Sequence, residues 1–438
     1  MTKSHAVLLL DKIASRQARV GVLGLGYVGL PLATEFALAG FNVVGIDVDP
    51  GRVERVNRGE SYIGDVHPAV LAGVVAKGLL RATADTAAAG ECDALIICVP
   101  TPLRKTKDPD VSFIVEAVTR VRSHARAGQL IVLESTTYPG TCEELVAPML
   151  AESGLEVGRE LFLAFSPERV DPGNKRYTTR NIPKVVGGIN EPSARVATAL
   201  YAAIIERVHP VSSTKAAEMV KLLENTFRSV NIALINELAL ICDRMGLDVW
   251  EVIEAAATKP FGFMPFYPGP GLGGHCLPID PLYLSWKAKL LDVEASFIDL
   301  AAKVNAAMPR HVVEKIAAAL NDDAKPVRGA RILILGVAYK RDVADVRESP
   351  ALDILKHLRA RGAVVAYSDP HVPRLSFDGL DLASEDLSAE RLAAADCVVV
   401  VADHTAFDYA AVVRHARLVL DTRNATRGHS GPARIVKL

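Results

Sequence analysis

Several features that would assign this chain to a special class are missing from its 438 residues. No run approaches the roughly 20 consecutive apolar residues that a membrane-spanning helix needs, and no basic start followed by an apolar stretch indicates a secretory signal. Six cysteines at irregular spacing include no Cys-x-x-Cys pair, which argues against a zinc site or a disulfide framework. The sequence therefore predicts a cytoplasmic protein with reduced thiols, no metal and no membrane partner.

Excess charge of either sign is also missing. The chain has 50 basic and 51 acidic residues and a formal net charge of −1. It therefore has no global basic field to hold nucleic acid, and local side chains must meet any anionic ligand.

The length and the spacing of apolar runs indicate several domains. At about 150 residues per domain, we expect three. Strand-like runs alternate with helical patterns up to about Gly188 and again after Ala330, which predicts an α/β fold with two Rossmann-like domains and mostly parallel sheets. A long central helix, Thr214 to Met245, and a helical middle domain would join them. The expected boundaries are 1–211 for the first Rossmann-like domain, 212–322 for the central domain and 323–438 for the second Rossmann-like domain.

The first strand-like run leads into a glycine-rich turn. Gly24, Gly26 and Gly29 have the spacing that lets a pyrophosphate approach backbone amides at the start of a helix. Asp47 ends the next strand-like run, where its carboxylate can bind the adenosine ribose and disfavour a 2′-phosphate, so NAD is favoured over NADP. The expected cofactor contacts here are Gly24, Gly26, Tyr27, Val28, Gly29 and Asp47.

Two further strand ends carry polar residues. Pro100 and Thr101 follow the run at Ala94, and Thr136 and Thr137 follow the run at Leu130. Ligands bind at the carboxyl ends of strands in open α/β sheets. Ordinary proline turns and helix caps are the alternative, and for the two threonines alone the alternatives are equally good.

A carboxylate and a lysine extend this pattern. Glu168 follows the run ending at Phe165, a position suited to a general base or to a group that positions water. Lys221 and Asn225 stand four residues apart on the long helix and so share one face. Taken singly, Glu168 would more often be a surface salt-bridge partner and Lys221 a surface lysine.

Cys276 lies in a glycine-rich run, four residues before Asp280. Cysteines with a structural role usually lie in apolar strands or helices, whereas glycines such as Gly273 allow a ligand to approach the backbone closely. A thiolate there can attack an aldehyde carbon, with Lys221 and Asn225 as candidate donors to the oxyanion. A nucleophilic thiol and a hydride acceptor in one chain suggest oxidation of an aldehyde through a thioester.

These motifs, in this order, closely resemble the nucleotide-sugar 6-dehydrogenase family from about Arg19 to Arg423. The matching segments are Gly24-x-Gly26-x-x-Gly29, Ser135-Thr136, Pro167-Glu168, Lys221-x-x-x-Asn225, Gly273-Gly274-x-Cys276-x-x-x-Asp280, Tyr339-Lys340 and Arg347-Glu348-Ser349.

The resemblance implies oxidation of a sugar C6 hydroxyl to the uronic acid, with two NAD reduced per sugar. Cys276 would be the nucleophile, with Lys221, Asn225 and Asp280 around the reacting centre. Glu168 and Thr136 would handle the hydrolytic water. The domain 1–211 would bind NAD, and the domain 323–438 would bind the nucleotide-sugar. Lys340 and Arg423 would reach the nucleotide-sugar, and Arg347 would lie near the cofactor.

Details around these motifs favour UDP-N-acetylglucosamine as the substrate. Arg169 and His275 differ from the residues usual in UDP-glucose enzymes, and the segment around Tyr267 resembles the UDP-N-acetylglucosamine branch. The arginine that a neighbouring subunit usually donates has no clear equivalent, and Lys259 is a candidate for its place. The expected substrate contacts are Glu168, Arg169, Lys221, Asn225, Lys259, Tyr267, Gly273, Lys340 and Arg423.

The product would supply surface polysaccharide such as O-antigen or capsule, and the long helix predicts a homodimer or a higher homo-oligomer. The same chemistry on UDP-N-acetylmannosamine or UDP-glucose is the nearest alternative. A two-electron hydroxyacid dehydrogenase, which needs no cysteine, and a non-catalytic nucleotide-sugar-binding regulator are more distant alternatives.

Overall fold

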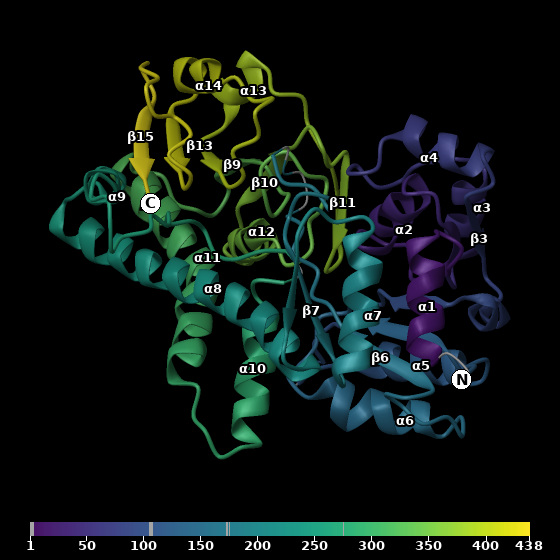
Figure 1. Cartoon of the computed structure of the whole chain (residues 1–438). Coiled ribbons are helices and arrows are strands. Elements are labelled where there is room, and N and C mark those ends of the chain that lie inside the picture. The colour runs from purple at the N-terminus through teal and green to yellow at the C-terminus, as the bar shows by residue number, and fades with distance from the viewer. Residues whose placement is uncertain (1–3, 105–107, 172–173, 175, 275) are drawn as a thin grey trace. The chain divides into compact units, whose positions relative to one another are not determined.

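The computed structural model describes residues 4–104, 108–171, 174, 176–274 and 276–438. Within these ranges no helix is long and apolar enough to cross a membrane. The chain divides into two compact units (Figure 1). Unit 1 comprises Met1–Glu224 with Trp286–Asp292, and unit 2 comprises Asn225–Ser285 with Val293–Leu438.

Unit 1 is built on an eight-stranded sheet of order β3-β2-β1-β4-β5-β6-β7-β8. The strands are β1 (Arg19–Leu23), β2 (Asn42–Ile46), β3 (Leu80–Thr83), β4 (Ala94–Ile97), β5 (Gln129–Leu133), β6 (Leu161–Phe165), β7 (Lys184–Gly188) and β8 (Val208–Val211). The first six run in parallel in the order of a dinucleotide-binding sheet, and β7 pairs antiparallel with β6. The predicted Rossmann-like domain is therefore present.

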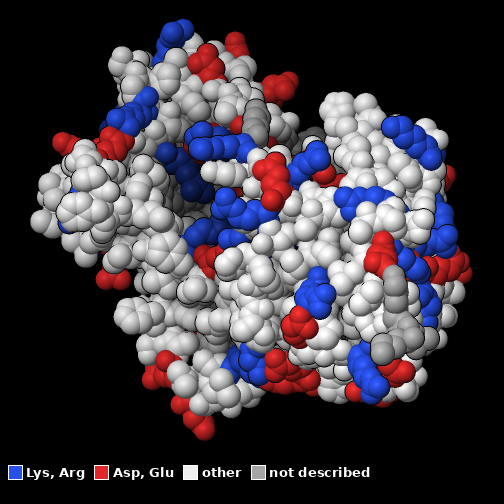
Figure 2. All heavy atoms as spheres, viewed as in Figure 1, with Lys and Arg blue, Asp and Glu red and all other residues white. Residues whose placement is uncertain are grey.

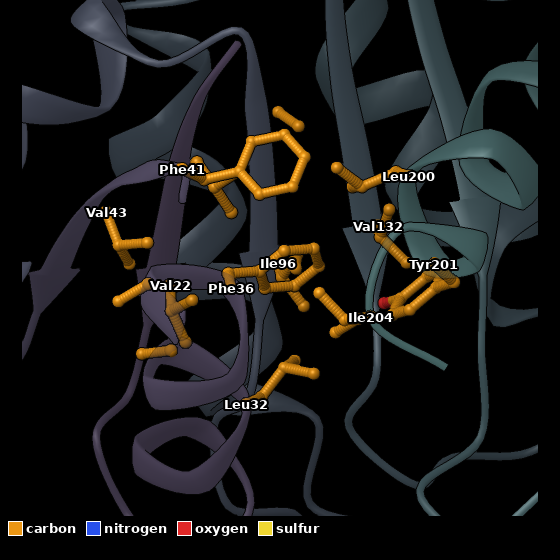
Figure 3. Packing of buried hydrophobic residues seen from close by; sticks show 14 of the residues in the cluster. Val22, Leu32, Phe36, Phe41, Val43, Ile96, Val132, Leu200, Tyr201 and Ile204 are labelled. Atoms are coloured by element: carbon orange, nitrogen blue, oxygen red, sulfur yellow. The ribbon is translucent and has the colours of Figure 1, made fainter. Parts of the chain in front are cut away.

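Helices cover both faces of this sheet. Alternate residues of β4 enter different hydrophobic clusters, Ile96 in one and Ile97 in the other, so each face of the strand is buried. In Figure 3, Phe36 of one helix faces Ile96, Val132 and Tyr201 across the first cluster. The helices are α1 (His5–Ala14), α2 (Gly29–Leu38), α3 (Pro50–Asn57), α4 (Pro68–Ala76), the 3₁₀ turn η1 (Thr86–Glu91), α5 (Ser112–Arg122), the π-helical turn η2 (Cys142–Val146), α6 (Ala147–Ala151) and α7 (Glu191–Ala202).

The long helix α8 spans Thr214–Met245, with the bounds that the sequence predicts. Its 32 residues correspond to about 48 Å at 1.5 Å per residue. Gly246 follows it with a φ of 69°, a backbone conformation that ends helices. The division between the units falls within α8, between Glu224 and Asn225.

Unit 2 contains a second parallel sheet, of order β10-β9-β13-β14-β15, and a β11–β12 hairpin. The strands are β9 (Arg331–Leu335), β10 (Val364–Ser368), β11 (Arg374–Phe377), β12 (Leu380–Ala383), β13 (Cys397–Val400), β14 (Leu418–Asp421) and β15 (Arg434–Lys437). Ile334 and Leu335 of β9 again enter separate clusters, so helices cover both faces. This confirms the second predicted α/β domain.

The helices that follow α8 are α9 (Val249–Ala257), α10 (Asp280–Lys289), α11 (Ser296–Asp322), α12 (Pro350–Ala360), α13 (Ala389–Ala394) and α14 (Tyr409–His415). The described part of 260–279 has no regular structure, as its prolines and glycines predict. On the face shown in Figure 2, basic and acidic side chains are interspersed, in keeping with the balanced composition.

Candidate active site

The glycine turn after β1 has the geometry of a dinucleotide site. Gly24 has a φ of +94°, and a Cβ there would lie 2.5 Å from the carbonyl oxygen of Cys98. A Cβ on Gly29, the first residue of α2, would lie 1.8 Å from the Gly24 carbonyl oxygen. Around Gly26 nothing lies within 4 Å of the equivalent position. Backbone atoms therefore occupy the space beside Gly24 and Gly29, whereas the space beside Gly26 is free. This arrangement fits a pyrophosphate lying against the backbone at Gly26.

Asp47 supports this turn. Its carboxylate is buried and accepts hydrogen bonds from the Leu25 amide at 2.7 Å and the Asp49 amide at 2.9 Å. The Arg52 guanidinium lies 3.4 Å from the carboxylate. Asp47 thus joins the end of β2 to the glycine turn. The sequence predicted its position but not this contact.

The loops after β4 and β5 are joined by a serine. Ser135 Oγ accepts a hydrogen bond from the Val99 amide at 2.9 Å. Within these loops Thr101 is buried, Thr136 is half-buried and Pro100 is exposed, whereas Tyr27 and Val28 in the glycine turn are exposed and half-buried. Strands β1 and β4 are neighbours, so the predicted cofactor residues after them lie at one edge of the sheet.

Glu168 and Lys221 come together in unit 1. Lys221 is 8% exposed, and its ammonium donates a 2.6 Å hydrogen bond to the backbone carbonyl of Glu168. The Glu168 carboxylate accepts from the amides of Arg169 at 2.7 Å and Val170 at 2.6 Å. These contacts exclude the surface alternatives for both residues.

A buried lysine that the sequence analysis missed lies behind Glu168. Lys184, the first residue of β7, has its ammonium 3.0 Å from a Glu134 oxygen and 3.3 Å from a Glu168 oxygen. The Tyr201 hydroxyl donates to the other Glu134 oxygen. A lysine at the start of an apolar strand was the one signal that could have identified it.

The pKa values in this cluster follow from these contacts. Burial alone would raise the pKa of Glu168, but the Lys184 ammonium and two backbone amides bring it below its usual value. Burial raises the pKa of Glu134 despite the same ammonium. Burial would lower the pKa of Lys184, but the two carboxylates raise it. Glu168 is therefore held as an anion at neutral pH.

Arg169 has partners of its own. Its guanidinium pairs with Glu224 of α8 at 2.5 Å and donates to the Pro183 carbonyl at 2.6 Å. It therefore fixes the loop after β6 against α8 within unit 1.

In unit 2, the cysteine loop packs on the segment between β9 and α12. The Gly274 amide donates to the Arg347 carbonyl at 3.0 Å. A Cβ on Gly273 would lie 2.7 Å from the Tyr339 Cβ, so glycine is required for this close approach. Cys276 is half-buried, and its carbonyl accepts from the Asp280 amide at 2.8 Å. His275 lies outside the described residues.

Asn225 and Asp280 form a buried pair beside this loop. The Asn225 side-chain amide donates to Asp280 Oδ2 at 2.5 Å, and both residues are at most 2% exposed. Arg228 donates to the side-chain oxygen Oδ1 of Asn225 at 2.6 Å, which orients the side-chain nitrogen of Asn225 toward Asp280. The structure thus joins the α8 asparagine to the aspartate of the cysteine motif.

Arg423 follows β14 and lies against the same loop. Its Nε donates to the Val401 carbonyl at 2.8 Å, and its Nη1 would lie 2.7 Å from a Cβ on Gly269. Burial, and to a smaller extent repulsion from Arg341, lowers the pKa of Arg423 to about 10. Lys340, half-buried, lies beside Arg341 in sequence. A cation under repulsion of this kind favours an anionic ligand.

Three other predicted residues have different surroundings. The Arg347 guanidinium is exposed and makes paired contacts with Asp345 at 3.0 and 2.6 Å. The Lys259 ammonium lies 5.1 Å from the ring centroid of Phe261. Tyr267 stacks on Trp250, with ring centroids 5.7 Å apart. A role for each in ligand binding stays a prediction.

A possible metal cluster occurs near β10 and β13. Among the described residues, ligand atoms of Asp342, His371 and His404 lie within 4.8 Å of one another. However, His404 Nδ1 accepts from the Asp342 amide at 2.9 Å, so the proton is on Nε2, which donates to Asp369 at 3.0 Å. Both ring nitrogens thus hold the loops together, which argues for a structural role.

The fold and these residues define a dinucleotide-dependent dehydrogenase with a second α/β domain and a cysteine-containing loop. Three domain models of the UDP-glucose/GDP-mannose dehydrogenase family match the chain: the NAD binding domain at residues 18–205, the central domain at 215–307 and the UDP binding domain at 333–428. The chain belongs to this family and contains its NAD-binding domain.

Relatives divide between two sugars. The chain is 38% identical to the UDP-N-acetyl-D-glucosamine 6-dehydrogenase of Pseudomonas aeruginosa, over 82% of this chain and 84% of that protein. It is 36% identical to the UDP-N-acetyl-D-mannosamine dehydrogenase of Methanococcus maripaludis strain C7, over 89% and 87%. The solved UDP-D-ManNAc dehydrogenase of Pyrococcus horikoshii matches with a TM-score of 0.88 and 34% identity, covering 96% of this chain and 98% of that one.

Proposed function

We propose that the protein is a UDP-N-acetyl-D-glucosamine 6-dehydrogenase, which oxidises the sugar C6 hydroxyl to a carboxylate through a thioester on Cys276. The observation that carries this proposal is the buried Asn225–Asp280 pair, with Asp280 bonded through its amide to the Cys276 carbonyl. A relative of that activity at 38% identity supports the sugar. The product would serve surface polysaccharide synthesis.

NAD, when bound, accepts a hydride from C6 in each of two oxidation steps. Gly24, Gly26 and Gly29 would hold its pyrophosphate, and Asp47 would bind its adenosine ribose. Further contacts from the protein would come from Tyr27, Val28, Pro100, Thr101, Thr136 and Arg347.

The protein's own residues would carry the remaining steps. After the hydroxyl becomes an aldehyde, the Cys276 thiolate adds to C6, and Lys221 and Asn225 stabilise the resulting oxyanion. Asp280 helps to move the proton that the C6 hydroxyl loses in the first oxidation. Loss of the second hydride gives the thioester; water then forms a C–O bond as the C–S bond breaks, and the electron pair returns to sulfur. Glu168 and Thr136 position that water.

The nucleotide-sugar would be held by charged side chains and by loops. Lys340 lies in the loop after β9, and Arg423 lies beside the cysteine loop. Both are cations and would offset the negative charge of the diphosphate. Gly273 and Tyr267 would contact the ligand from the cysteine loop, with Glu168 and Arg169 on the loop after β6. Lys259 would contribute from the exposed segment after α9.

Substrate choice is tested by kcat/KM for UDP-N-acetylglucosamine, UDP-N-acetylmannosamine and UDP-glucose under identical conditions. The proposal expects the first to exceed each of the others by at least about tenfold, the size that a few pocket contacts can provide. A higher kcat/KM for UDP-N-acetylmannosamine would transfer the assignment to the other group of relatives.

A second copy of the chain is the partner that the long helix fits. On the unit 2 part of α8, large apolar side chains between 40% and 66% exposed recur at helical spacing, which makes one apolar stripe. They are Phe227, Leu234, Leu238, Ile241 and Met245. We propose a homodimer through this stripe. Sedimentation of the Leu234→Glu, Leu238→Glu double variant should show monomers, and an unchanged oligomer would contradict it.

A further inference from the structure

We infer that Lys184 is a positioning residue for the hydrolytic step: its ammonium fixes the Glu168 loop, and through that loop's backbone it fixes Lys221. This inference rests on the proposed function for the identity of that step. It adds a residue outside the predicted site and gives the buried charges around Glu134 a purpose.

The topology of the sheet brings Lys184 to the functional edge. β7 runs antiparallel to β6, with Ala164 opposite Gly188 and Phe165 opposite Gly187. The first residue of β7 therefore lies beyond the carboxyl end of β6, where the Glu168 loop begins. In a sheet with only parallel strands, the first residue of a strand would lie at the opposite edge.

The contacts form a chain from Lys184 to Lys221. The Lys184 ammonium bridges Glu134 at 3.0 Å and Glu168 at 3.3 Å. The Glu168 carboxylate also accepts hydrogen bonds from two backbone amides on its other oxygen, so both of its oxygens are held in place. The carbonyl of the same residue then accepts from Lys221 at 2.6 Å. Loss of the Lys184 ammonium should therefore make the position of the Lys221 ammonium less fixed.

The charged and titratable groups that face Glu168 come from several elements. Lys184 lies on β7, Glu134 follows β5 and Lys221 lies on α8. Tyr201 of α7 donates to Glu134, and the Cys98 thiol after β4 interacts with the same carboxylates. The Arg169–Glu224 pair flanks the loop. Lys184 and Lys221 are the cations that favour the ionised form of Glu168.

Burial makes the ammonium difficult to replace. Lys184 is 4% exposed and the Glu134 side chain is fully buried, so a neutral residue at 184 leaves two carboxylates close together in a medium of low polarity. Such a pair takes up a proton more readily. The acidic limb of the pH–rate profile, which protonation of Glu168 sets, should then move to higher pH.

The test compares Lys184→Met and Lys184→Gln with Lys184→Arg. The control is Lys12→Met, which removes the ion pair with buried Asp93 at 2.8 Å. Asp93 precedes β4 and so lies at the opposite edge of the sheet from Glu134. The control thus removes a lysine from a buried carboxylate without touching the site.

With NAD and UDP-N-acetylglucosamine, the neutral variants should lose about 100-fold in kcat, the lower end of the contribution usual for a general acid or base. The loss should be greatest at low pH, and KM for NAD should stay within about twofold. Intact mass should show the sugar acyl group retained on the protein, because hydrolysis slows. Lys184→Arg should restore kcat and the pH profile. A uniform loss at all pH values, or the same changes in Lys12→Met, would overturn the inference.

A second measurement needs no turnover. Lys221 should react faster with trinitrobenzenesulfonate in Lys184→Met than in the wild type, by about tenfold, while exposed Lys215 reacts equally in both. Peptide mass spectrometry gives both rates. An unchanged Lys221 rate would overturn the inference. If wild-type protein oxidises none of the three UDP-sugars but the Lys221 rate still rises, the proposed function fails and the positioning contact stands.

Discussion

Asn225 on α8 donates a 2.5 Å hydrogen bond from its side-chain amide to Asp280, the first residue of α10. The two residues lie 55 positions apart in the chain. This bond holds the unit 2 part of α8, which carries Asn225, to the residue that follows the cysteine loop. The geometry of the proposed oxyanion site in unit 2 depends on it.

Replacement of Asn225 by Ala should remove both the donor to Asp280 and the proposed donor to the oxyanion. We expect kcat to fall about 100-fold, the loss typical for one oxyanion donor. Steady-state rates with varied NAD should show an unchanged KM for NAD. A variant with near wild-type kcat would contradict the role of Asn225.

Replacement of Cys276 by Ser should abolish net uronate formation, because a serine hydroxyl is a weak nucleophile without a base beside it. NAD binding should be unchanged, since the glycine turn lies in unit 1. Product analysis by mass spectrometry and NAD titration measure the two effects separately. Uronate production at the wild-type rate would rule out the thioester.

The glycine turn allows a matched pair of variants. Gly26→Ala should fold normally because nothing lies within 4 Å of the new Cβ, yet it should weaken NAD binding by at least about tenfold by blocking the pyrophosphate. Gly29→Ala should lower the melting temperature, because its Cβ would meet the Gly24 carbonyl oxygen at 1.8 Å. Equal NAD affinity in Gly26→Ala and wild type would remove the turn from the cofactor site.

Asp369 should make the second α/β domain sensitive to acid. Burial alone would raise its pKa, but hydrogen bonds from His404 and from backbone amides bring it below 3.8. Its contribution to stability is therefore present above pH 3.8 and is lost as the pH falls through the lower, folded value.

Asp369→Asn should lower the free energy of unfolding at pH 7 by about 1–3 kcal/mol. In the variant, this free energy should also fall less between pH 7 and acid pH than it does in the wild type. Urea unfolding at pH 7 and at about pH 3, which is below the ordinary pKa of an aspartate side chain, measures both effects. The same acid dependence in the variant and the wild type would assign the effect to other carboxylates.

The sequence predicted most elements because their signals are local. Apolar periodicity ended by Gly246 was enough to place α8, and short runs of apolar residues were enough to place β1 and β9. The antiparallel direction of β7 was not predictable, because it depends on pairing with β6 rather than on residues within Lys184–Gly188. For the same reason Lys184 was overlooked.

The candidate site divides in the same way. The glycine turn, Cys276 and Glu168 were identifiable from residue type and spacing. The Asn225–Asp280 bond and the hydrogen bond from Lys221 to the Glu168 carbonyl join segments that are distant in sequence, so only the fold reveals them. The contact of Asp47 with the glycine turn belongs with these.

The number of NADH molecules formed per sugar at limiting UDP-N-acetylglucosamine tests the central claim most directly. Absorbance at complete conversion gives this ratio, and product mass identifies the acid. The thioester route on Cys276 predicts two NADH and one uronate for each sugar consumed. One NADH per sugar, with aldehyde or another two-electron product, would contradict the account.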